Sequence, residues 1–154
     1  MLDEPALKDL ILEHCWRVND RDIEGLLRLY SPDVRFEDPV GSGMRYGREA
    51  LRAHGNSALA SNAVEIPGTP VANRNSQQAI VPIAATMDYL PLGPSLTRMG
   101  ILPTPRRPVG QRMRCHFIML VRAGADGLIE EMQGIWGRTD VALVDDAAPG
   151  PAVR

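Results

Sequence analysis

Cysteine, excess charge of one sign and long apolar runs are all scarce in this sequence, and each absence excludes a class of protein. The chain has 154 residues and 2 cysteines, Cys15 and Cys115, without Cys-x-x-Cys spacing, which argues against a disulfide framework or a zinc knuckle. A formal net charge of −2 gives no broad basic field for nucleic acid or anionic lipid. The start of the chain lacks the pattern of a signal peptide, and no run approaches the length that spans a bilayer. We therefore expect a cytoplasmic protein with a small-molecule partner, no nucleic acid and no membrane.

The composition that remains, 44% hydrophobic and 23% charged, is typical of one globular domain. Periodicity predicts three helices in the N-terminal half: residues 5–18, a second helix that follows Asp22 and includes Tyr30, and residues 48–60. Alternation predicts strands at residues 34–38, 64–66, 78–89, 111–122 and 128–136. Helices followed by strands favour an α+β fold. We assign residues 1–140 to a single domain and residues 141–154 to a flexible tail.

One segment does not fit this pattern. Residues 91–108 are rich in proline and too long for an ordinary hairpin loop, so we interpret them as an inserted loop that serves as a lid or an interface arm.

Asp38 is the leading candidate for chemistry. Strand alternation places it on the same face as Val34 and Phe36, and a carboxylate among apolar side chains has the raised proton affinity of a general base. An apolar strand face is expected to line the same pocket; its members are Met113, Cys115, Phe117, Met119 and Val121. Two simpler interpretations stay open, since Asp before Pro is common in turns and an apolar face is often ordinary core.

Several other site classes lack their motifs. The glycines at 41, 43 and 47 follow a strand and precede a helix, but their spacing and the absence of βαβ alternation exclude a dinucleotide fold. The sequence contains no Gly-x-Ser-x-Gly elbow, phosphate loop or His-Glu-x-x-His motif. Cys115 and His116 are strand neighbours that point to opposite faces, which disfavours a shared metal ion. We expect no metal and no cofactor.

Three stretches resemble the bacterial ketosteroid isomerases of the nuclear-transport-factor-2-like, SnoaL-like superfamily. They are residues 22–42, which include Glu37-Asp38-Pro39, then Tyr46-Gly-Arg-Glu-Ala-Leu51, and Gly127-Leu-Ile-Glu-Glu-Met-Gln-Gly-Ile-Trp136. The resemblance implies a cone-shaped, curved, mixed or antiparallel β-sheet closed by three helices, and a homodimer formed through the outer sheet face.

The same resemblance implies roles for single residues. Asp38 matches the general base, and Tyr30 matches a tyrosine that supports the oxyanion donor. The two donor positions themselves hold His14 and Met119, so His14 is the expected electrophilic partner. The expected substrate-binding residues are Phe36, Cys115, Phe117, Met119, Met132 and Trp136.

Three functions follow as hypotheses. The first is an isomerase-like enzyme that moves a proton on an apolar carbonyl substrate, such as a steroid, polyketide or terpenoid. The second is epoxide opening, cyclisation or dehydration on the same scaffold. The third is a non-catalytic binding domain, in which backbone amides would hold Asp38 in a turn.

Overall fold

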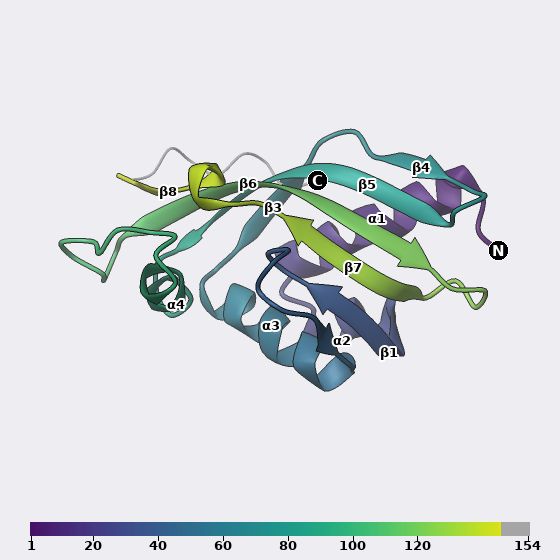
Figure 1. The fold of residues 1–154 in the computed structure, drawn as a ribbon, viewed down its shortest axis with the longest axis horizontal. Coiled ribbons are helices and arrows are strands. Elements are labelled where there is room, and N and C mark those ends of the chain that lie inside the picture. Colours follow the sequence, from purple (N-terminus) through teal and green to yellow (C-terminus); the bar gives the residue numbers. More distant parts are fainter. Residues whose placement is uncertain (146–154) are drawn as a thin grey trace.

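The computed structural model describes residues 1–145 of the chain as one α+β unit (Figure 1). The helices are α1 (Glu4–Asn19), α2 (Ile23–Arg28), α3 (Arg48–Ala60) and α4 (Gly93–Arg98), with a short 3-10 turn at Arg138–Asp140. The strands are β1 (Tyr30–Glu37), β2 (Arg45–Tyr46), β3 (Val64–Pro67), β4 (Val71–Asn73), β5 (Gln78–Asp88), β6 (Arg112–Ala123), β7 (Ile129–Ile135) and β8 (Val141–Val144). None of the helices in this part of the chain has the length and apolar character needed to cross a membrane.

All eight strands form one curved mixed sheet. Its central order is β2-β1-β7-β6-β5-β3, with β4 on β5 and β8 on β6. The β1–β7 pair is parallel and the others are antiparallel. This is the predicted cone-type α+β architecture, in which α1, α2 and α3 close the sheet.

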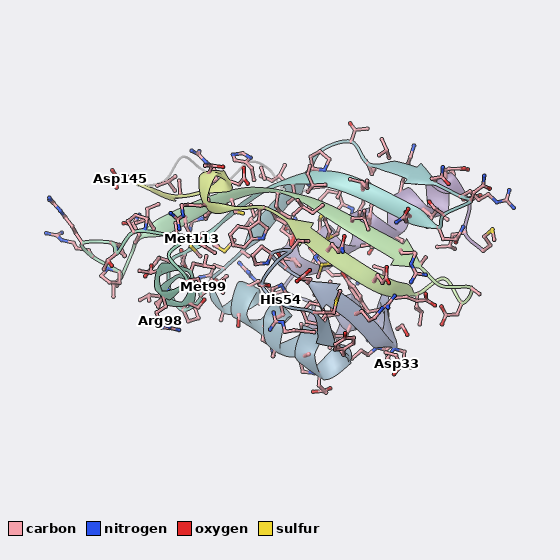
Figure 2. The ribbon with its side chains drawn as sticks, viewed as in Figure 1. Asp33, His54, Arg98, Met99, Met113 and Asp145 are labelled. Atoms are coloured by element: carbon pink, nitrogen blue, oxygen red, sulfur yellow. The ribbon has the colours of Figure 1, made fainter. Side chains whose placement is uncertain are left out.

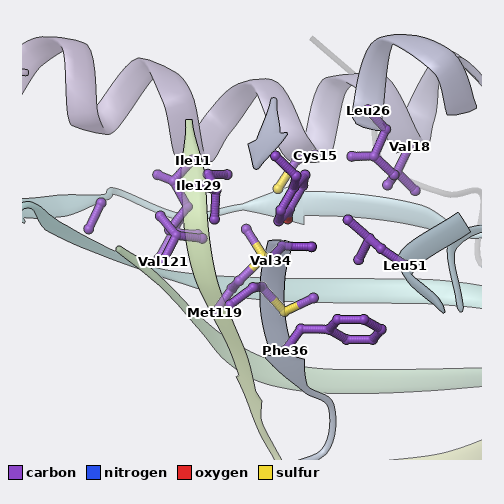
Figure 3. Packing of buried hydrophobic residues seen from close by; sticks show 14 of the residues in the cluster. Ile11, Cys15, Val18, Leu26, Val34, Phe36, Leu51, Met119, Val121 and Ile129 are labelled. Atoms are coloured by element: carbon purple, nitrogen blue, oxygen red, sulfur yellow. The ribbon is translucent and has the colours of Figure 1, made fainter. Parts of the chain in front are cut away.

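The main core lies between these helices and the inner face of the sheet (Figure 3). Inward positions alternate along β6, where Met113, Met119 and Val121 are at most 1% exposed. Capping fixes where the first two helices begin: Asp3 accepts a hydrogen bond from the backbone of Ala6, and Asp22 accepts one from Gly25.

The prediction made the second helix too long. In the structure, α2 ends at Arg28, and Tyr30 begins β1, where it pairs with Ile129 of β7 and is fully buried. Tertiary pairing with the last long strand therefore overrides the helical periodicity that included Tyr30.

Two further expectations differ from the structure. The segment at 91–108 contains α4, which begins with Gly93 and Pro94 and packs through Leu96 against a second apolar cluster. The predicted flexible tail is wrong for Val141–Val144, which form β8 because β6 extends beyond β7 and offers them a partner strand. Residues 146–154 of that predicted tail lie outside the described residues.

Candidate active site

A cavity of about 650 Å³ opens between the inner sheet face, α3, α4 and the loop after β1. It brings together most of the predicted site residues, and those that line it are His14, Asp38, Cys115, Phe117, Met119, Met132 and Trp136. Phe36 and Tyr30 are fully buried in the core and do not line the cavity, so Phe36 is corrected from a substrate contact to a support for its neighbours. Its ring packs against the His54 ring and the Arg45 guanidinium.

Asp38 lies directly after β1, with its carboxylate held by two side chains. Trp136 Nε1 donates to Oδ1 at 2.7 Å, and His54 Nε2 lies 2.9 Å from Oδ2. The carboxylate is thus bound by side chains of α3 and of the segment after β7, and the backbone-amide turn expected for a silent binding domain is not the arrangement seen. About 20% of the Asp38 side chain remains exposed.

The expectation of a raised proton affinity at Asp38 is wrong. Burial is the largest single influence and raises the pKa of this carboxyl group, but the lowering influences together outweigh it, first the hydrogen bond from His54 and then the one from Trp136. The net pKa lies below the ordinary value, so Asp38 is ionised at neutral pH. An ionised carboxylate at the cavity wall is ready to accept a proton.

Arg45 determines which ring nitrogen of His54 carries the proton. Arg45 Nη2 lies 2.9 Å from His54 Nδ1, and a guanidinium can only donate hydrogen bonds. Nδ1 must therefore be the acceptor, which leaves the proton on Nε2, where it points at Asp38 Oδ2. Arg45, His54 and Asp38 form a chain that aims one N–H donor at the carboxylate.

Gly134 of β7 makes room for Asp38. A Cβ atom built on Gly134 would lie 2.2 Å from Asp38 Oδ1 and 2.6 Å from its Cγ. Such separations are far inside van der Waals contact, so any side chain at this position would displace the carboxylate. A backbone hydrogen bond also joins the loop after β1 to β7, because Val40 N–H donates to the Gly134 carbonyl at 2.9 Å.

Glu65 is a second carboxyl group in the same cavity, and it comes from β3. It is 8% exposed. Asn19, at the end of α1, holds its backbone from both sides: Nδ2 donates to the Glu65 carbonyl and Oδ1 accepts from the Glu65 N–H, each at 2.7 Å. One carboxyl oxygen, Oε1, lies 3.5 Å from His14 Nε2. The other, Oε2, is buried without a nitrogen or oxygen donor from residues 1–145.

His14 and Tyr30 form a buried pair behind Glu65. The Tyr30 hydroxyl lies 2.6 Å from His14 Nδ1. Burial, then the charges of Glu65, Cys15 and Asp38, raise the pKa of Tyr30 well above its ordinary value, so the phenol keeps its proton. Because a buried hydroxyl proton needs an acceptor, Tyr30 donates to Nδ1 and His14 presents its Nε2–H to Glu65. His14 is therefore oriented toward a carboxyl group rather than free to polarise a ketone.

The two cysteines are not nucleophiles. Burial raises the pKa of Cys15 far above its ordinary value, and the neighbouring Glu65 carboxyl group raises it further. Burial, then the charges of Asp38, Asp140 and Glu65, raises the pKa of Cys115 to about 12. Both stay as thiols at neutral pH. Asp38, Glu65 and Cys115 all line the same cavity.

Sequence reasoning missed Glu65, His54 and Arg45. Val64 and Ile66 flank Glu65, so alternation assigns their face to the core and Glu65 to solvent, whereas Glu65 is the most buried residue of β3. His54 had a usable signal, because it lies on the same helical stripe as the buried Leu51.

Comparisons with known proteins identify the family of this chain and the fold that it shares. The model of the SnoaL-like domain family matches residues 12–132. Epoxide hydrolase LasB of Streptomyces lasalocidi is 51% identical over 148 residues, which are 95% of this chain and 52% of LasB. The chain thus spans about half the length of this curated relative.

Two solved structures share the fold. SalBIII, described as an epoxide hydrolase/cyclase-like enzyme with a role in pyran ring formation in the polyether salinomycin, has a TM-score of 0.74 at 24% identity, over 90% of this chain and 95% of SalBIII. RV0760c from Mycobacterium tuberculosis, solved with estradiol-17beta-hemisuccinate, has a TM-score of 0.71 at 19% identity, over 90% of this chain and 98% of RV0760c. With the family match over most of the chain, these findings confirm the predicted superfamily: the chain belongs to the SnoaL-like domain family.

Proposed function

We propose that this protein opens an epoxide, with Asp38 as the general base and Glu65 as the general acid. The observation that carries the proposal is that two carboxyl groups, of Asp38 and Glu65, line one apolar cavity. Their hydrogen-bonding surroundings differ. Asp38 is kept ionised by its N–H donors, whereas one oxygen of Glu65, Oε2, is buried without a nitrogen or oxygen donor from residues 1–145.

The chemistry balances with these two groups alone. Asp38 removes the proton of a hydroxyl group, whose oxygen forms a bond to one epoxide carbon. The bond from that carbon to the epoxide oxygen breaks, and the oxygen takes the proton from the carboxyl group of Glu65. Each turnover leaves Asp38 protonated and Glu65 ionised, and proton exchange with solvent restores both.

The surroundings favour a hydroxyl group of the substrate itself as the nucleophile. The cavity walls are mainly apolar, with Leu51, Met119 and Phe117 among them, and an apolar wall limits the water that competes for the epoxide. Ring closure would then give a cyclic ether. The names of LasB and SalBIII, which describe epoxide hydrolase and cyclase-like enzymes, support this reaction class.

Ketosteroid-type isomerisation, the first expectation from the sequence, is supported less well. That reaction needs donors for an enolate oxygen, whereas His14 points its N–H at Glu65 and Met119 has no donor. The names of the two relatives also favour epoxide chemistry over isomerisation.

The proposal is tested by incubating the purified protein with an aliphatic hydroxy-epoxide in H₂¹⁸O and analysing the product by mass spectrometry. Ring closure gives an isomer of the substrate without ¹⁸O, whereas hydrolysis adds one water and gives a triol with one ¹⁸O. Either product, formed faster than in buffer, supports epoxide opening, and ring closure supports the internal nucleophile. Recovery of unreacted epoxide at the buffer rate would contradict the proposal.

A homodimer through the outer sheet face and a cytoplasmic location stay predictions. The dimer is compatible with the large apolar residues Ile118 and Ile135, which are 37% and 47% exposed.

A further inference from the structure

The methionines of this chain gather on one cavity. Of the 7 methionines in the sequence, all but Met1 line it, namely Met44, Met87, Met99, Met113, Met119 and Met132. A methionine side chain is unbranched and polarizable, so it adapts to irregular apolar shapes better than leucine or valine. Such a concentration of methionines indicates a cavity wall that adjusts its shape to a bound ligand.

Strand register divides these methionines into two groups. Met119 pairs with Gly134, the residue on which Asp38 packs, and Met132 lies two positions earlier on β7. Both methionines are therefore at the Asp38 end of the cavity. Met113 pairs with Met87, and both belong to the apolar cluster that contains Leu96 of α4. Met119 lies six positions after Met113 on β6, which corresponds to about 20 Å of extended strand.

The two carboxyl groups lie beside only one part of the cavity wall that β6 forms. Glu65 pairs with Ala85, which pairs with Cys115, so Glu65 is level with Cys115 on β6. Asp38 and Glu65 therefore bracket the portion from Met119 to Cys115. Beyond Cys115, the cavity is also lined by Met113, Met87 and residues of α4. Figure 2 shows Met99 and Met113 near α4, and His54 on α3.

Helix α4 forms a fixed wall with an exposed apolar rim. Its start is anchored because Leu92 N–H donates to the buried Ser61 Oγ at 3.1 Å, and Tyr89 and Thr97 share a 2.7 Å hydrogen bond. At its end, Met99 lines the cavity and is 51% exposed. Met44, in the loop after β1, lines it too and is 42% exposed. Core packing does not account for two methionines that meet water at a cavity mouth.

We propose that the part of the cavity between α4 and the start of β6 is a binding subsite for a flexible apolar chain of the ligand. The reacting group of that ligand lies between Asp38 and Glu65, and the chain extends along Met113, Met87 and Met99. Only the placement of the reacting group rests on the proposed function, because the binding of an apolar chain needs no turnover.

The test uses protein labelled with ¹³C at the methionine methyl groups, titrated with n-decanol and, separately, with n-butanol. Single Met→Leu variants assign the resonances, and Met1, outside the cavity, is the internal control. Decanol is expected to shift Met87, Met99 and Met113 in a saturable manner, and butanol at equal concentration is expected to leave those three unchanged. Decanol shifts that are absent, or that are confined to Met119 and Met132, would overturn the subsite.

A plugged variant checks the location. Ser95 lines the cavity from α4, so Ser95→Trp should weaken decanol binding at least tenfold. Val109→Trp is the matched control, since Val109 is 83% exposed and does not line the cavity. If Ser95→Trp does not fold, Met99→Lys replaces it, with a charge at the rim and at least a threefold loss expected. Unchanged binding in the folded variant would overturn the proposal.

The outcomes separate the two proposals. Saturable decanol shifts in a protein that leaves epoxides unreacted would uphold the subsite and remove the proposed function. Epoxide opening without those shifts would do the reverse.

Discussion

The two carboxyl groups of the cavity are held in opposite ways. Both oxygens of Asp38 face N–H donors, and the chain that supplies one of them runs through His54 to the exposed Arg45. Glu65 is set deeper, with a side chain 10% exposed against 20% for Asp38. Its Oε1 faces His14 Nε2, and its Oε2 has no nitrogen or oxygen donor among residues 1–145. The first environment stabilises a negative charge, and the second supplies fewer donors to the carboxyl group. In the proposed reaction, the difference between base and acid thus follows from the surroundings of each carboxyl group rather than from residue type.

A large effect is expected from filling the space between Gly134 and Asp38. Gly134→Ala places a methyl group where Asp38 Oδ1 now lies, and a displacement of about 1 Å at a reacting group typically costs about 100-fold in rate. We expect kcat/KM for epoxide opening to fall by roughly that factor in a folded protein. Gly137→Ala is the control, because the nearest atom to its added Cβ is 3.8 Å away. Parental activity in Gly134→Ala would show that the position of Asp38 is not critical.

A smaller effect is expected from removing the donors to Asp38 one at a time. The acid limb of kcat/KM reports the pKa of the free enzyme's base. His54 and Trp136 lower the Asp38 pKa, so their removal raises it and moves the acid limb to higher pH. His54→Phe should move the limb further than Trp136→Phe, since the His54 hydrogen bond is the larger of the two lowering causes. A limb that stays in place in both variants would separate Asp38 from the reaction.

The smallest effect is expected on the Glu65 side and concerns stability. Tyr30→Phe leaves His14 Nδ1 without its buried partner, which should lower the free energy of unfolding by about 1–3 kcal/mol in urea denaturation. Tyr46→Phe is the matched control, because Tyr46 is 66% exposed. Equal stability of the two variants would mean that the His14–Tyr30 pair does not support this side of the cavity.

The same contrast explains how far the sequence predicts the site. Asp38 was found because it continues the face of Val34 and Phe36, and strand alternation is a local property of the chain. Glu65 was missed because α1 covers the face of β3 that local alternation assigns to solvent, and that cover depends on contacts between distant segments. The fold class followed from helix and strand order, whereas α4 and β8 depend on anchors such as Ser61 and on the free length of β6.

The most direct test of the base and acid pair compares the parent with Asp38→Asn, Glu65→Gln and the double variant on one hydroxy-epoxide. Both substitutions keep side-chain shape and remove proton transfer. We expect each single variant to lose about 100-fold or more in kcat, within the usual range for general acid–base catalysis. Because two groups that act in one step are not additive, the double variant should be little slower than the slower single variant. Parental turnover in either single variant, or losses that multiply in full in the double variant, would contradict the account.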